Sequence, residues 1–113
     1  MSFNIDTVMV DMLSAIKGTV ENNWDIVKSN ANHLLERDKE RLQMLAVLRI
    51  TGCLTDEKYQ ARLEDQKLVI ESELSEFIAI NETTAKLSAY AAIAILEKAV
   101  GGADSLSCVL EAV

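Results

Sequence analysis

A helical spacing of apolar residues runs almost unbroken through the first 48 positions of this chain. Successive members stand three or four residues apart, and only Asp38 is polar, in the series Ile5, Met9, Met12, Ile16, Val20, Trp24, Val27, Ala31, Leu34, Asp38, Leu42, Leu45 and Leu48. This period keeps one side of an α-helix in register, whereas a half-buried strand needs alternation every two residues. The pattern predicts an amphipathic helical arm that is built to pack on other helices.

Composition supports an all-α fold. Half of the 113 residues are apolar, which is enough for a core, but only five side chains are aromatic, so aliphatic groups and alanine must fill it. The chain has no proline and four glycines, whereas β-rich folds normally use both residue types in their turns. At this length one helical domain covering residues 1–113 is the default expectation.

The clearest boundary is the segment 51–55, which reads Thr-Gly-Cys-Leu-Thr. Gly52 suits the left-handed conformation that closes a helix, and Thr55 suits a helix N-cap, with acidic Asp56 and Glu57 in the first turn that follows. The sequence therefore predicts two antiparallel arms, 4–50 and 56–100, joined by a tight turn, with a short tail at 101–113.

Both arms are weak helix formers at the same height. Folding the chain about residue 53 sets position 22 level with position 84, and the segments 21–25 and 81–84 are rich in Asn and Thr. These residues favour caps over helix interiors. Two arrangements follow: continuous arms forming a hairpin about 65 Å long at about 1.5 Å per residue, or arms bent near Asn22 and Thr83 into four helices.

Self-association is expected in either arrangement, and a dimer is favoured. A two-helix hairpin cannot cover its own apolar faces. The segment 87–96 is also apolar on nearly all sides, as in helices buried against several neighbours. Candidate interaction residues lie on the ladder and on this segment: Met9, Met12, Trp24, Leu87, Ala91 and Ile95.

Two ladder residues admit alternative interpretations. Trp24 is favoured as a core anchor where helices cross, with a partner-binding anchor as the alternative because tryptophan is enriched at binding hot spots. Asp38 is either a buried polar group that fixes register or the point where the face reaches solvent, and the second interpretation is favoured.

Residues for chemistry are scarce. His33 is the only histidine; with Glu36 one turn on, it offers a single weak metal-ligand pair. Cys53 and Cys108 lack metal-site spacing, and neither sits in an obviously activating environment. No phosphate loop is present. The sequence therefore predicts no catalytic, cofactor-binding or metal-binding residues and a protein that is not an enzyme.

The distribution of charge limits the classes of partner that this chain can bind. The net charge is −7, and the eleven basic residues are scattered beside acids, which argues against nucleic-acid binding. No signal-peptide pattern opens the chain, and the longest stretch low in charge, ten residues, is about half of what a membrane span needs. A cytoplasmic location is expected, with membrane contact unlikely.

Three classes of function remain. The favoured one is a non-enzymatic helical assembly or adaptor protein acting through self-association and protein–protein contacts. The alternative is an amphipathic protein on a lipid surface, although its N-terminal arm carries few of the basic residues that such helices use. An enzyme or metal carrier is the third, and no motif supports it.

Overall fold

The computed structural model of this chain describes residues 3–102, and within that range it is all-α. It contains α1 (Ile5–Val20), a 3₁₀ turn (Glu21–Asn23), α2 (Trp24–Ile50), α3 (Asp56–Ser75) and α4 (Glu82–Gly101). The expected all-helical class is confirmed. The predicted tail beyond residue 102, including Cys108, lies outside the described residues.

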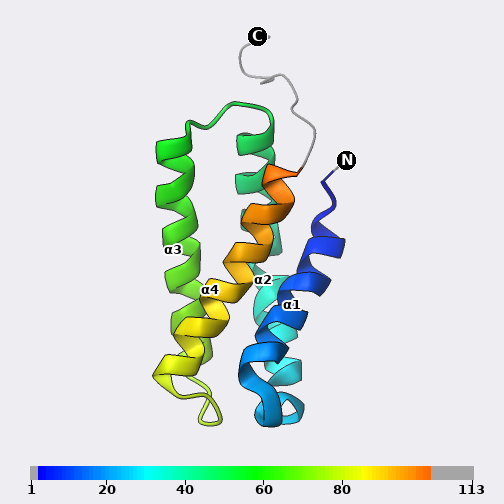
Figure 1. The fold of residues 1–113 in the computed structure, drawn as a ribbon, viewed down its shortest axis with the longest axis vertical. Helices are drawn as coiled ribbons and strands as arrows, with labels where there is room; N and C mark the ends of the chain where they lie inside the picture. The colour runs from blue at the N-terminus through cyan, green and yellow to red at the C-terminus, as the bar shows by residue number, and fades with distance from the viewer. Residues whose placement is uncertain (1–2, 103–113) are drawn as a thin grey trace.

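Consecutive helices run antiparallel along the long axis of the molecule (Figure 1). In this view α4 and α1 lie side by side in front of α2, and α3 lies on the left. The α1–α4 contact is the most extensive between any two described helices, followed by α3–α4 and α1–α2.

Side-chain caps fix three helix starts. Asn4, Thr55 and Asn81 each accept a hydrogen bond from the backbone N–H three residues on, at 3.2, 3.3 and 2.8 Å. These bonds satisfy amide groups that a helix start otherwise leaves without an acceptor. The connection between α2 and α3 spans residues 51–55, with Gly52 in the left-handed region at φ 80° and Thr55 as the cap.

Both arms are interrupted close to the predicted weak level. The first break is the turn Glu21–Asn23, and the second is the connection 76–81. The two breaks touch, because the Asn23 side-chain amide donates a 2.9 Å hydrogen bond to the carbonyl of Ala79. The second break begins earlier than expected: α3 ends at Ser75, whereas the sequence placed the bend near Thr83.

Two contacts within single arms follow from these bends. Lys39 pairs with Asp6 at 2.6 Å in the first arm, and Lys67 lies against the ring of Tyr90 in the second. Continuous helices would hold these partners far apart along the arm. The structure accordingly measures 48 × 24 × 19 Å, less than the length of about 65 Å that straight arms would give.

The core is aliphatic and continuous along the helices. Met12, Ile16, Leu42, Ile70 and Leu96 have no exposed surface. A second group of fully buried residues on α4 is small, which allows the neighbouring backbones to approach closely: Ala85, Ser88, Ala89 and Ala92.

Asp38 belongs to this buried set, because only 1% of it is exposed. The interpretation that the ladder reaches solvent at Asp38 is therefore wrong, and a buried polar group is what the structure has. At the interface between α2 and α3, a polar side chain of α3 lies opposite Asp38, which accounts for a polar residue at this buried position.

Candidate functional site

Three of the six candidate interaction residues lie in the core. Met12 is fully buried, and Met9 and Trp24 are 6% and 9% exposed. Trp24 begins α2 immediately after the 3₁₀ turn, so its ring anchors the bend between α1 and α2. In this conformation these three side chains present almost no surface to a partner, and their place is within the helix packing of one chain.

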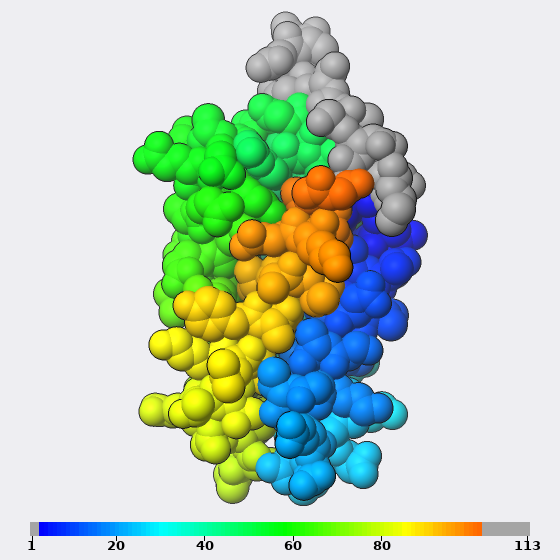
Figure 2. All heavy atoms as spheres, in the orientation of Figure 1, coloured from blue at the N-terminus to red at the C-terminus, as the bar shows by residue number. Residues whose placement is uncertain are grey.

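The other three candidates lie on the outer side of α4, together with two neighbours. We call this set the α4 outer face: Leu87, Tyr90, Ala91, Ala94 and Ile95. Leu87 and Tyr90 are 55% and 50% exposed, Ala94 is exposed, and Ala91 and Ile95 are half-buried. Their spacing places them on one side of the helix, opposite the buried alanines. Figure 2 shows α4 uncovered along the front of the molecule between α1 and α3.

Tyr90 is held in place at the edge of this face by a lysine from α3. The Lys67 ammonium lies 3.9 Å from the centroid of the Tyr90 ring and 2.6 Å from the carboxylate of Glu64. The hydrogen bond to Glu64 raises the pKa of Lys67, so the ammonium stays charged. A cation over a tyrosine ring is attracted by the ring quadrupole. The exposed aromatic side chain is therefore positioned before any partner arrives.

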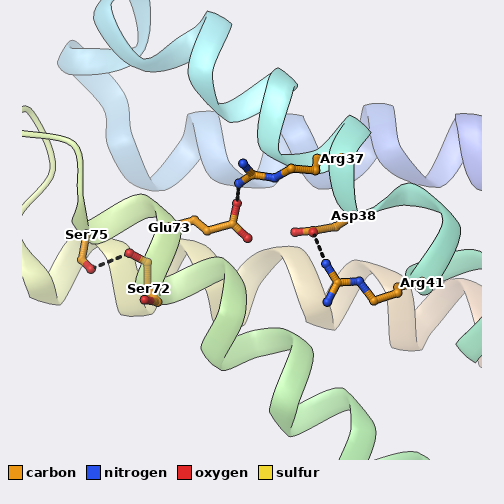
Figure 3. A network of polar contacts seen from close by, with 6 residues as sticks. All are labelled: Arg37, Asp38, Arg41, Ser72, Glu73 and Ser75. Carbon is orange, nitrogen blue, oxygen red and sulfur yellow. Dashed lines mark hydrogen bonds and ion pairs between the residues drawn. The ribbon is translucent and has the colours of Figure 1, made fainter.

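A second polar feature lies between α2 and α3, where Asp38 meets Glu73 (Figure 3). Asp38 Oδ1 accepts a 3.1 Å bond from Arg41, and Glu73 pairs with Arg37. The other carboxylate oxygen of Asp38, Oδ2, is buried and has no hydrogen-bond partner among the described residues. Burial, followed by the proximity of Asp38, raises the pKa of Glu73 despite the opposing effect of Arg37. Sequence reasoning missed Glu73, which looked like one of many solvated acids.

The remaining candidates for chemistry stay apart. His33 and Glu36 are both exposed on α2. Cys53 lies in the α2–α3 connection, where the Thr51 hydroxyl contacts its sulfur at 3.4 Å. Within residues 3–102 no three side chains of the metal-binding types gather as a metal centre requires. None of the helices in that range is long and apolar enough to cross a membrane.

Comparisons with known proteins add no relative: no protein-family model, curated protein or solved structure matches this chain.

Proposed function

We propose that this protein is a non-enzymatic helical bundle that acts by self-association through the α4 outer face. The observation that carries the proposal is the group of five neighbouring apolar residues on the outer side of that helix, three of them exposed and two half-buried. Scattered apolar side chains are normal on a protein surface, but a contiguous group on one helix is typical of an interface. Leu87 and Tyr90 are the two large exposed side chains of the group, as Met44 and Val47 are on α2, and on α4 the apolar surface continues through Ala91, Ala94 and Ile95.

A second copy of the same helix fits this face. Antiparallel pairing centred on Ala91 would set Leu87 opposite Ile95 of the other copy. The small Ala91 side chains of the two copies would then face each other and let the helices approach closely. The same register brings Lys86 about level with Glu97 of the second copy, on the same flank, and the pairing occurs twice because a two-fold interface is self-complementary. Apolar contact and charge complementarity therefore favour the same partner.

The direct test measures molar mass by chromatography with light scattering over a range of protein concentrations. The wild-type chain is expected to form a dimer whose fraction rises with concentration. Leu87→Glu is expected to shift the protein to monomer, because a desolvated carboxylate in an apolar interface has no partner. Helix content from circular dichroism should be unchanged, since Leu87 is more than half exposed.

Ile26→Glu is the matched control. Ile26 is 69% exposed and lies in the first turn of α2, on a different helix from the α4 outer face. The Ile26→Glu substitution introduces the same charge away from the proposed interface and should leave dimerisation unchanged. A monomeric wild-type chain at high concentration, or equal weakening by both variants, would contradict the proposal.

A lipid surface is the second candidate for the same face. Leu87 and Tyr90 are side chains that insert into an interface between headgroups and acyl chains, but the net charge of −7 opposes anionic membranes. Co-sedimentation with zwitterionic phosphatidylcholine vesicles distinguishes the two candidates. Capture by vesicles that is lost in Leu87→Glu, from a chain that is monomeric in solution, would favour the lipid surface.

A further inference from the structure

Asp38 is a carboxylate with half of its hydrogen-bonding capacity unused. It is 1% exposed, and Arg41 contacts only Oδ1. Oδ2 is buried without a partner among the described residues. A charged oxygen removed from water in this way is costly, and buried polar atoms in folded proteins are nearly always hydrogen-bonded. Some group must therefore satisfy Oδ2.

A group of the right kind is the carboxyl of Glu73, whose pKa responds to Asp38. In Figure 3 it points across the α2–α3 interface toward Asp38. An ionised carboxylate has only acceptor oxygens and cannot donate to Oδ2, whereas a protonated one has an O–H donor. One proton on the pair converts two facing acceptors into a donor and an acceptor.

The neighbouring arginines do not remove the need for that proton. The side chains of Arg37 and Arg41 are each 61% exposed, so water and salt screen their charges. The side chains of Asp38 and Glu73 are only 1% and 17% exposed, so their mutual repulsion is screened much less. Two carboxylates that share such a site do not both ionise readily.

Other charged groups at this height are engaged elsewhere. From α1, Asp6 is bound to Lys39. From α4, Glu82 and Lys86 line a groove with Glu71 and Ser75, on the opposite edge of α3 from Glu73. The charged groups that contact the pair are Arg37 and Arg41 of α2, and Arg62 and Asp65 of α3 line a groove with Arg41.

We propose that Asp38 and Glu73 form a binding site for one proton, which the Glu73 carboxyl donates to Asp38 Oδ2. The proton is taken from water when the folded pair forms and returns to water when the pair ionises. Loss of the proton leaves two negative charges facing each other between α2 and α3, and Asp38 Oδ2 again has no hydrogen-bond donor. The α2–α3 contact is therefore a pH-sensitive element, tightest with the proton bound.

The sign of the pH effect follows from the raised pKa of Glu73. The folded chain binds the proton more tightly than the unfolded chain, in which the group titrates near its ordinary value of 4.5. The stabilising contribution is complete below that value and is lost as the pH rises through the folded pKa.

The test follows the carboxyl ¹³C chemical shift of Glu73 by NMR in the wild-type protein as the pH is raised. We expect a midpoint above 4.5, accompanied by a shift of the Asp38 carboxyl signal in the same step because the two groups share the proton. This measurement needs no substitution, so it stands even where a variant folds poorly.

A variant pair supplies the second measurement. In Glu73→Gln the amide donates permanently to Oδ2, so the variant should unfold less readily than wild type at pH 8 and equally at pH 4. The gain in the folding equilibrium constant should reach about tenfold for each unit by which the wild-type pKa exceeds its ordinary value. Glu76→Gln, three residues along and exposed, should keep the wild-type profile.

A Glu73 midpoint at or below 4.5, with Glu73→Gln following the wild-type profile, would overturn the shared proton and leave an ordered water as the partner of Oδ2. Because the pair lies away from the α4 outer face, its titration is independent of self-association, and either proposal can fail without the other.

Discussion

At the scale of one residue, Tyr59 buries a neutral hydroxyl, which costs less to leave without a partner than the charged oxygen of Asp38. The residue is 5% exposed, and its hydroxyl is buried with no hydrogen-bond partner among the described residues. Arg49 lies 5.6 Å from the ring centroid, over its face. Burial raises the pKa of Tyr59 to about 12. The ring contributes to the core, whereas the hydroxyl opposes folding.

We therefore expect Tyr59→Phe to increase the free energy of unfolding by about 1 kcal/mol, since an unsatisfied buried hydroxyl costs roughly 1–3 kcal/mol. Urea denaturation at pH 7 measures it. The wild-type protein should lose stability as the pH rises from 10 through about 12, because ionisation of Tyr59 favours the unfolded chain. The variant lacks the hydroxyl and should not show this loss. A loss of stability in Tyr59→Phe would contradict the unsatisfied state.

For Asp38 and Glu73, the sequence predicted only part of what the structure shows. The spacing of the ladder located Asp38 as the one polar member, but did not decide its environment. Folding the chain about residue 53 would set position 38 level with position 68, about one and a half helical turns from Glu73. Helical side chains lean toward their own N-terminus, so Asp38 and Glu73 reach toward each other from different heights on antiparallel helices. This offset is a property of packing that no local pattern contains.

At the scale of the element, the end of α1 is formed against a backbone preference. Glu21 has φ 55° and ψ −115°, values close to those of a type II′ turn position that glycine normally occupies. For a residue with a Cβ, such a conformation costs about 1–3 kcal/mol. The chain tolerates this because the Asn23–Ala79 hydrogen bond and the buried Trp24 ring hold the residues that follow the bend.

Glu21→Gly should therefore raise the free energy of unfolding by about 1 kcal/mol, less than the full strain because glycine also gains entropy in the unfolded chain. Thermal denaturation followed by circular dichroism gives the difference. Glu21→Ala keeps the Cβ and removes the charge, so it should show no comparable gain. Equal stabilisation by both variants would assign the effect to charge.

Some helix boundaries could be predicted from local sequence signals, and others could not. Gly52 and Thr55 were readable because one residue type at each position has a specific backbone or capping role. The end of α3 was not, because Phe77, Ile78 and Ile80 continue a helical apolar period. The structure uses Phe77 and Ile80 to anchor a loop and leaves Ile78 fully exposed, so the period there reflects tertiary packing.

At the scale of the whole molecule, the bent arms could not be chosen from sequence for a geometric reason. Thr19 and Ser88 form a hydroxyl–hydroxyl contact between α1 and α4. Folding about residue 53 puts these positions at nearly the same height whether the arms are straight or bent. The contacts that differ, Asp6–Lys39 and Lys67–Tyr90, join residues of the same arm, and nothing in their local sequence marks them as partners.

The proposed dimer makes a prediction that concerns orientation as well as affinity. In the antiparallel register each Lys86 lies beside Glu97 of the second copy. Lys86→Glu and Glu97→Lys should each weaken self-association several-fold, because two exposed pairs of roughly 0.2–1 kcal/mol become repulsive. The double variant should restore wild-type affinity. Sedimentation equilibrium gives the dissociation constants, and the differences should shrink in high salt.

This design separates specific pairing from general repulsion. Lys86→Glu makes the net charge of −7 more negative by two units, whereas Glu97→Lys makes it less negative by the same amount. General repulsion between acidic chains would therefore move the two single variants in opposite directions. Weakening in both, with recovery in the double variant, requires the two positions to face each other across the interface. Opposite shifts, or a double variant that stays monomeric, would rule out this register while leaving the Leu87→Glu test of the α4 outer face intact.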